Sequence, residues 1–401
     1  MQTTRSPLFL ISLLGALSVI SPFAIDLYLP AYQQVAASFN VANTVVALTL
    51  SSYFIGMAMG QVFYGPLLDR FGRKRPLLGG LMLFILASVG GAFAPTIHAL
   101  IGLRFIQAFG GCVAGVASLA MVRDFFPAAD APRILSRLFL FIAISPLLAP
   151  STGGLIALAF GWKMVFILLA LIVTAIAALI FFLLPEGHVP DTTISLKPGP
   201  ILREYGAIIR HPRFITYALS GAFSFAGLFT YVAGSPIIFM ENFHLSARIY
   251  SGIFALLATG FIGGSQLNVA LLKRHSSETL FQRVLTLQVL TGIIFALGTY
   301  LQLYGLIATL ILFYLYLSCA GITYPNAAAL AITPFTKNAG SASALLGFIQ
   351  LGLGAIVSTF ISAAPPHDSF PIILILAVSS LIGIGILFAG RKRAMHCAIA
   401  E

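Results

Sequence analysis

The chain has 401 residues, of which 59% are hydrophobic and only 8% charged, and its mean hydropathy is +1.01. A soluble globular protein carries about 25% charged residues, so this composition excludes a soluble domain and indicates an integral membrane protein. The net charge of +11 would fit a nucleic-acid partner, but the positions of the charges argue against one.

Twelve segments are long and apolar enough to cross a bilayer, which takes roughly 20 residues of helix. The predicted spans are 8–30, 44–66, 77–95, 100–121, 135–158, 163–184, 214–239, 249–270, 281–302, 306–329, 340–362 and 370–390. The first segment has no small-residue cleavage site after it, so we expect an uncleaved helix. We predict an all-α integral membrane fold with two six-helix halves, 1–184 and 214–401, joined by a cytoplasmic linker at 185–213.

Lysine and arginine predict the orientation of these spans. With the N-terminus placed in the cytoplasm, 19 of the 22 Lys and Arg residues fall in predicted inner segments. Only Lys163 and Arg248 fall in outer segments, and only Arg104 lies inside a span. Because cytoplasmic loops retain positive charge, both termini are predicted to be cytoplasmic. The charges then face anionic lipid, and no nucleic acid is needed to explain them.

The most basic loop lies between the second and third predicted spans. It combines an acid at Asp69, a tight turn at Gly72 and four cations, which are Arg70, Arg73, Lys74 and Arg75. The stretch from Gly60 to Arg70 is echoed by that from Gly264 to Arg274, which indicates an internal repeat. A repeat of two parallel six-helix halves is typical of transporters with a site near the midplane.

Asp26 is the only one of the eleven acids that lies well inside a predicted span. A charge within the membrane is costly enough to indicate a functional residue. A second explanation also fits: Asp26 lies four residues before Pro30, so it could be solvated at the outer end of its helix.

Arg104 is the only basic residue within a span, and it lies four residues after the start of the fourth one. The first span runs outward and the fourth runs inward, so Arg104 and Asp26 are predicted at similar depth. A nearby cation favours an ionised carboxylate and burial favours a neutral one, a balance that suits a proton carrier. Alternatively, Arg104 donates structural hydrogen bonds to backbone carbonyls, which is compatible with the functional role.

One face of the fourth span carries small or polar residues spaced by three or four positions. They are Arg104, Gln107, Gly111, Gly115 and Ser118. This face could line a cavity or allow close helix packing, and the sequence leaves both explanations open. Two prolines in the fifth span, Pro146 and Pro150, are followed by Gly153 and Gly154. The prolines remove backbone donors and predict a kinked helix that can rock between two states.

Aromatic residues of the second half could form the wall of a cavity for apolar ligands of varied shape. Lipid-facing bulk is the simpler explanation for any single one of them. The predicted cavity residues are Tyr28, Gln107, Gly111, Phe225 and Tyr324. No nucleotide-binding loop, metal-ligand cluster or nucleophile motif is present, so we expect no enzyme, no cofactor and no metal site.

Several stretches resemble the Bcr/CflA drug-efflux group of the major facilitator superfamily. They are Pro22 to Pro30, the loop from Gly65 to Lys74, Arg104 to Gly110, Arg123-Asp124, Ala149 to Gly154 and Gly340 to Gly347. The resemblance covers most of the chain. It implies a monomeric proton/drug antiporter of the bacterial inner membrane that exports hydrophobic molecules such as bicyclomycin or phenicols.

The resemblance also implies roles for single residues. Asp26 matches the membrane acid and Arg104 the arginine of the fourth helix, so both would couple transport to protons. A cytoplasmic latch that holds the halves in the outward-facing state is matched by Asp69, Arg73 and Asp124. The antiporter motif is matched by Pro146, Pro150, Gly153 and Gly154. Ala149 stands where the superfamily usually has glycine, which weakens the motif but not its prolines.

Other functions stay open at this point. A proton-linked transporter of a sugar or other small metabolite is the alternative, although few polar side chains are predicted to be buried. A membrane-embedded enzyme would need a catalytic cluster, and a receptor or scaffold would not need a proline-kinked helix. With one membrane acid, an antiporter is expected to move one proton per cycle.

Overall fold

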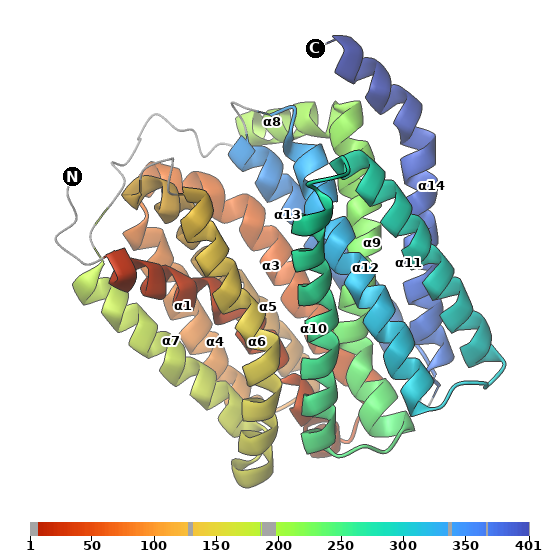
Figure 1. Cartoon of the computed structure of the whole chain (residues 1–401). Coiled ribbons are helices and arrows are strands. Elements are labelled where there is room, and N and C mark those ends of the chain that lie inside the picture. Colours follow the sequence, from red (N-terminus) through yellow and green to blue (C-terminus); the bar gives the residue numbers. More distant parts are fainter. Residues whose placement is uncertain are drawn as a thin grey trace. The chain divides into compact units, whose positions relative to one another are not determined.

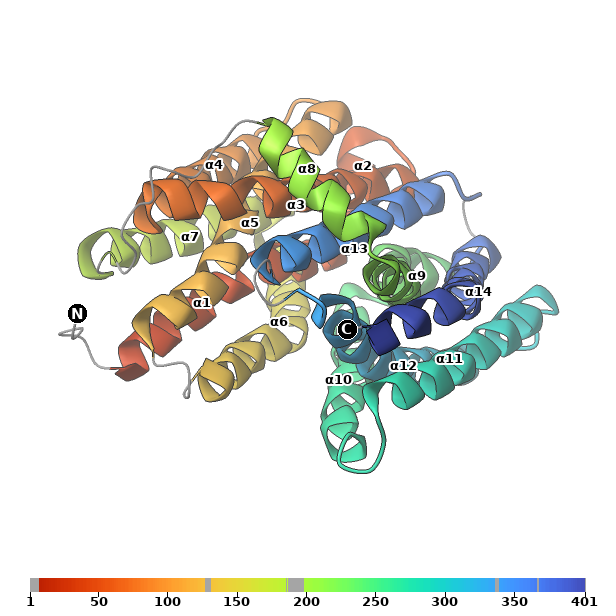
Figure 2. The ribbon, with the colours of Figure 1, turned by 90° about the horizontal axis from the view of Figure 1, so that it is seen from above.

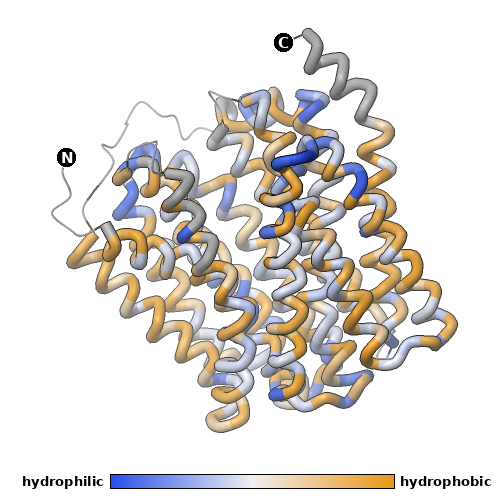
Figure 3. The backbone as a smooth tube through the Cα atoms, viewed as in Figure 1, coloured by the Kyte–Doolittle hydropathy of each residue, from blue (hydrophilic) through white to orange (hydrophobic). Residues whose placement is uncertain are grey.

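The computed structural model describes residues 7–126, 131–184, 186, 198–335, 339–365 and 368–400. All regular structure in these residues is helical, and twelve helical segments are long and apolar enough to cross a membrane. Hydrophobic residues follow the middles of the helices, and hydrophilic residues gather at their ends (Figure 3). The predicted all-α membrane fold with twelve spans is therefore confirmed.

The helices divide into two compact units (Figure 1). Unit 1 comprises Met1–Val41 and Ser52–Pro198, and unit 2 comprises Ala42–Ser51 and Gly199–Glu401. The first turns of helix α3 (Asn43–Phe71) therefore group with unit 2 and the rest of α3 with unit 1. The assignment of 1–184 and 214–401 as the two moving halves remains a prediction.

Unit 1 contains the helices α1 (Pro7–Asp26), η1 (Leu29–Ala31), α2 (Tyr32–Phe39), most of α3, α4 (Lys74–Ala92), α5 (Ile97–Phe125), α6 (Ala131–Phe160) and α7 (Lys163–Leu183). Within it, α4 packs against α5 and α7, and α1 packs against α5 and α6. Gly80 and Gly110 let α4 and α5 approach until a Cβ on either glycine would overlap the backbone of the other helix. Between α3 and α4 the chain turns at Gly72, whose φ of 82° confirms the predicted tight turn.

The first span is longer than predicted. Pro30 sits in the first turn of η1, a position that proline tolerates, so the chain continues into α2 instead of leaving the membrane segment. The apolar helical segment runs from Leu8 to Phe39, and Asn40 ends it in the left-handed region with φ 51°. Asp26 is therefore the last residue of α1 but lies well within the apolar segment.

Unit 2 contains α8 (Pro198–Arg210), α9 (Pro212–Pro236), η2 (Ile237–Asn242), α10 (Ala247–Leu271), α11 (Ser277–Tyr300), α12 (Leu306–Ile332), α13 (Ala339–Ser362) and α14 (Phe370–Ala400). α9 packs against α12, α13 and α14, α10 packs against α12, and α11 packs against α12 and α14. After Pro236, which lacks a backbone donor, the chain forms one π-helical turn, η2.

Helix α8 was not predicted, because it lies inside the polar stretch 185–213 and is only 13 residues long. It is amphipathic, with Tyr205 and Ile208 buried and Leu202 exposed. Figure 2 views α9 nearly along its axis, whereas α8 lies lengthwise, so α8 runs across the direction of α9. The rest of the predicted linker, from 187 to 197, lies outside the described residues.

Candidate functional site

Asp26 is buried, with 6% of its surface exposed. The Ser145 hydroxyl on α6 donates a hydrogen bond of 3.2 Å to Oδ2 of Asp26. Ser145 lies directly before Pro146 and is itself 1% exposed. The structure thus contradicts the explanation that Asp26 is solvated at a helix end, and it holds this carboxylate between α1 and α6.

Helix α6 can carry Ser145 up to Asp26 because the two helices pack closely. A Cβ at Gly153 would overlap the carbonyl oxygen of Leu27, so only glycine fits this contact. Gly154 is also buried. Pro146 and Pro150 both lie inside α6, where each removes one backbone donor. All four predicted motif residues therefore lie on α6 within the nine positions after Ser145, the residue that bonds to Asp26.

Arg104 is completely buried in α5. Its Nη1 donates to the carbonyl of Ala24 at 3.3 Å and to Oε1 of Gln107 at 2.7 Å. Gln107 in turn donates from Nε2 to the Ser88 hydroxyl at 2.7 Å. A continuous hydrogen-bonded chain therefore joins α1, α5 and α4 through Arg104 and Gln107.

Aromatic rings enclose the rest of the Arg104 guanidinium. Its central carbon lies 4.2 Å from the ring centroid of Tyr53, 4.8 Å from that of Tyr28 and 5.8 Å from that of Phe166. A guanidinium over aromatic faces is stabilised by cation–π attraction, more strongly where water is excluded. Among the residues that the structure describes, Nε and Nη2 nevertheless have no hydrogen-bond partner. Arg104 thus has two N–H-bearing nitrogens available to an acceptor within a buried aromatic cage.

Asp26 and Arg104 lie close in the fold but do not form an ion pair within 4.0 Å among the described residues. Arg104 contacts Ala24, two residues before Asp26, so both groups lie at the same end of α1. The hydrogen bond to Ala24 is the structural role that the sequence left open for Arg104. The direct carboxylate–guanidinium pair is not present in this structure.

The remaining predicted cavity residues separate into two groups. In unit 1, Tyr28 packs on Arg104, and a Cβ at Gly111 would contact Phe84 at 2.8 Å and the Ser21 hydroxyl at 3.2 Å. Close helix packing therefore accounts for Gly111. In unit 2, the rings of Phe225 and Tyr324 stack with centroids 4.4 Å apart, and both side chains are half-buried.

Phe225 and Tyr324 belong to a larger aromatic cluster. Phe225 also packs on Phe229 at 5.1 Å and on Phe261 at 6.0 Å, so α9, α10 and α12 all contribute rings. Nearby in the same unit, buried polar groups bond to one another: Ser224 donates to Gln288 at 2.7 Å and lies 2.8 Å from the Thr323 hydroxyl.

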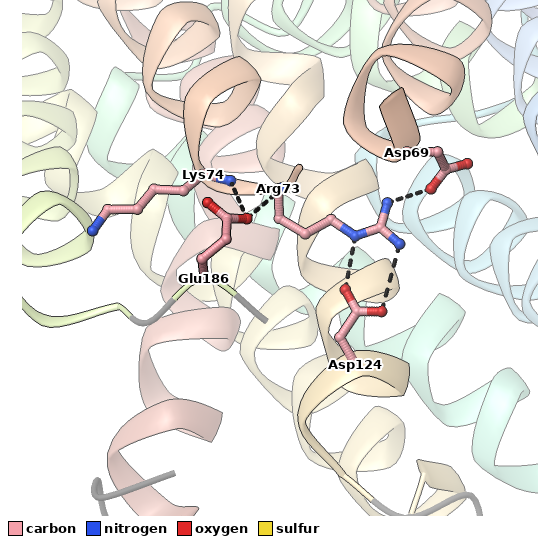
Figure 4. A network of polar contacts seen from close by, with 5 residues as sticks. All are labelled: Asp69, Arg73, Lys74, Asp124 and Glu186. Atoms are coloured by element: carbon pink, nitrogen blue, oxygen red, sulfur yellow. Dashed lines mark hydrogen bonds and ion pairs between the residues drawn. The ribbon is translucent and has the colours of Figure 1, made fainter. Parts of the chain in front are cut away.

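The three predicted latch residues meet at one end of unit 1 (Figure 4). Arg73 donates from Nε to Asp124 at 2.7 Å and from Nη1 to Asp69. Burial acts to lower the pKa of Arg73, but the hydrogen bonds to Asp124 and Asp69 outweigh it and raise that pKa. Arg73 is therefore a fixed cation held by two carboxylates, although its side chain is only 9% exposed.

Tyr53 and Glu186 are among the residues at these sites that the sequence did not predict. Of the three rings around Arg104, that of Tyr53 lies closest to the guanidinium. Nothing in the sequence near position 53 distinguishes this tyrosine from other aromatic residues of a span. Glu186 accepts hydrogen bonds from the backbone of the basic loop (Figure 4). An acid directly after an apolar span, opposite a strongly basic loop, was the signal that would have indicated it.

Comparisons with known proteins agree with this fold. The chain matches the family model described as Major Facilitator Superfamily over residues 14–359. A Bacillus subtilis (strain 168) protein named "Uncharacterized MFS-type transporter YdgK" is 31% identical over 389 residues, which cover 95% of both chains. A Haemophilus influenzae protein named "Bicyclomycin resistance protein homolog" is 29% identical over 384 residues, which cover 96% of both. A solved D-xylose-proton symporter superposes with a TM-score of 0.74 over 95% of this chain and 97% of its own, but at 17% identity this likeness shows the fold alone.

Proposed function

Because this chain belongs to the major facilitator superfamily, we propose that it exports small hydrophobic drugs in exchange for protons. Bicyclomycin- or phenicol-like compounds are the expected substrates. The name of the Haemophilus influenzae relative supports drug resistance as the function, at 29% identity. The resemblance of the first-helix and fifth-helix motifs to the Bcr/CflA group points the same way.

The observation that carries the proposal is the environment of Asp26. This carboxylate lies in an apolar helical segment, is 6% exposed and accepts a hydrogen bond from the hydroxyl of Ser145. A hydroxyl can donate to a carboxylate or accept from a carboxylic acid, so Ser145 can bond to either state of Asp26. Such a site can hold and release a proton without the loss of its hydrogen bond.

In the proposed cycle, deprotonated Asp26 favours drug binding from the inner side, and protonation from the outside releases the drug. A proton that moves down ~100 mV yields about 2.3 kcal/mol. That free energy supports roughly a fiftyfold gradient of a neutral drug. Arg104, with two nitrogens that lack partners among the described residues, would donate a hydrogen bond to the carboxylate when Asp26 is ionised.

The aromatic cluster of unit 2 would supply the apolar surface for the drug. Stacked rings bind planar or apolar groups without fixed hydrogen-bond directions, which suits substrates of varied shape. Phe225 and Tyr324 are half-buried, so part of each ring is available for contact. The Arg73 network would act as the cytoplasmic latch.

The proposed setting is the inner membrane of a bacterium, with both termini in the cytoplasm. The distribution of 19 of 22 Lys and Arg residues on one side supports that orientation. We expect a monomer whose partners are drugs, protons and membrane lipid.

A proton-linked sugar transporter is the second candidate, because the D-xylose-proton symporter shares the fold. Sugar binding requires many hydrogen-bonding side chains around the ligand. In unit 2 the buried Ser224, Gln288 and Thr323 bond to one another instead. This arrangement favours an apolar substrate.

Transport in everted membrane vesicles separates the two candidates. Vesicles that contain the protein should accumulate ethidium or chloramphenicol when energised, and an uncoupler should abolish the accumulation. Uptake of sugars into right-side-out vesicles, without accumulation of any drug in a wide panel, would contradict the proposal and support the sugar transporter.

A further inference from the structure

Glu186 forms a contact that none of the proposed roles explains. Its Oε1 accepts hydrogen bonds from the backbone N–H of Arg73 at 2.8 Å and from that of Lys74 at 3.3 Å (Figure 4). These two groups open helix α4, for which Arg73 is the N-cap residue. The carboxylate of a residue more than 100 positions away therefore caps α4.

Helix α4 lacks any local alternative to this cap. Arg73 makes no side-chain capping hydrogen bond, because a guanidinium carries only donors and cannot accept from the free N–H groups of the helix. Pro76 in the first turn has no N–H to satisfy. A helix N-terminus is stabilised by negative charge and by acceptors for its free N–H groups. The carboxylate of Glu186 supplies the charge and the acceptor oxygen.

The contact is reciprocal. The ammonium of Lys74 donates to the carbonyl of Leu184 at 3.0 Å, and Leu184 is the C-cap residue of α7. A cation at the carboxyl end of a helix is favourable for the same electrostatic reason as an anion at the amino end. The start of α4 and the end of α7 thus cap each other through Glu186 and Lys74.

The contact between the end of α7 and the start of α4 also involves the predicted latch. Glu186 lies two residues after Leu184, the C-cap residue of α7, and the next described element along the chain is α8. Arg73 is held through its backbone by Glu186 and through its side chain by Asp69 and Asp124. The first described residue after α7 is therefore bonded to the backbone of Arg73, the central cation of the predicted latch.

We propose that Glu186 is a positioning residue: it holds the backbone at Arg73 so that the guanidinium reaches Asp124, and it thereby couples the end of α7 to the latch. The role in the transport cycle rests on the proposed function, whereas the positioning of Arg73 does not. Glu186 is exposed, so its contribution comes from the two backbone hydrogen bonds more than from its screened charge.

Hydrogen–deuterium exchange of the purified full-length protein tests the positioning directly. In Glu186→Ala, exchange should rise about fivefold in peptides over 72–77 and at the inner end of α5 around Asp124, the change that corresponds to loss of one helix cap. Glu186→Gln keeps an acceptor oxygen and should restore most of the protection. The matched control is Glu278→Ala, which removes an acid from the first turn of α11 and should leave both regions unchanged.

A double-mutant cycle distinguishes positioning from general stabilisation. In an Arg73→Ala background, Glu186→Ala should have no further effect on exchange around Asp124. The proposal would be overturned if Glu186→Ala raised exchange around Asp124 equally in the wild-type and Arg73→Ala backgrounds. Unchanged exchange over 72–77 in Glu186→Ala would also overturn it.

The transport role has its own readout. Glu186→Ala should slow drug turnover about fivefold, by the loss of one helix cap, with little change in KM. Unchanged turnover, despite altered exchange, would overturn the coupling to transport. If the wild type moves no drug, the proposed function fails, and the exchange cycle still decides whether Glu186 positions Arg73.

Discussion

At the scale of single residues, the Arg104 site joins a permanent positive charge to aromatic rings and neutral acceptors. Its two hydrogen bonds to described residues run from Nη1 to Ala24 and Gln107. Asp26, close by on α1, bonds to Ser145 instead. In the proposed cycle, Arg104 contacts the Asp26 carboxylate only while Asp26 is ionised. A permanent ion pair between the two would keep Asp26 ionised and prevent it from taking up a proton.

The ring of Tyr53 should stabilise the buried guanidinium. Tyr53→Leu is expected to lower stability by about 1–2 kcal/mol, the range for a desolvated cation–π contact, beyond the packing that it removes. Tyr53→Phe keeps the ring and should retain most of the stability. Thermal unfolding of the detergent-purified protein measures both. Equal losses in the two variants would show that the hydroxyl, not the ring, matters.

At the scale of helices, the close contact between α1 and α6 places Ser145 beside Asp26. The apolar runs of the sequence were sufficient to predict the twelve spans, because burial in a membrane imposes length and composition on each. They did not predict α8, which is short and polar, or the extension to Phe39, where Pro30 begins a new helical turn instead of ending the segment.

Gly153→Ala tests this helix contact. A methyl group at position 153 would overlap the Leu27 carbonyl, so α1 and α6 must separate, at a cost of about 1–3 kcal/mol. Drug efflux should fall together with stability. Gly102→Ala is the control, since a Cβ there meets no atom within 4 Å. Equal behaviour of the two variants would contradict the importance of the α1–α6 contact.

At the scale of the whole molecule, the chain contains two compact helical units and one well-buried membrane carboxylate among the described spans. The sequence was sufficient to single out Asp26 and Arg104 as charges within apolar segments, and the structure buries both. Their coupling role and the latch role of Asp69, Arg73 and Asp124 remain predictions. It could not predict the partners of Arg104, since Tyr53 and Phe166 are ordinary aromatic residues until the fold brings them together.

A single membrane acid predicts that one proton enters for each neutral drug molecule exported. The exchange is then electrogenic, and a membrane potential alone should drive it. Proteoliposomes with an imposed potassium diffusion potential would measure the charge moved per drug molecule. We expect a value of one, and a value of two would require a second proton-binding residue.

The most direct test of the central claim compares the wild type with Asp26→Asn in everted vesicles, with and without an uncoupler. Asparagine keeps the size of the side chain and a partner for Ser145 but cannot exchange a proton. We predict uncoupler-sensitive ethidium or chloramphenicol accumulation in the wild type and none in Asp26→Asn, at equal protein levels. Undiminished, uncoupler-sensitive accumulation by Asp26→Asn would contradict the account and place the coupled proton on another residue.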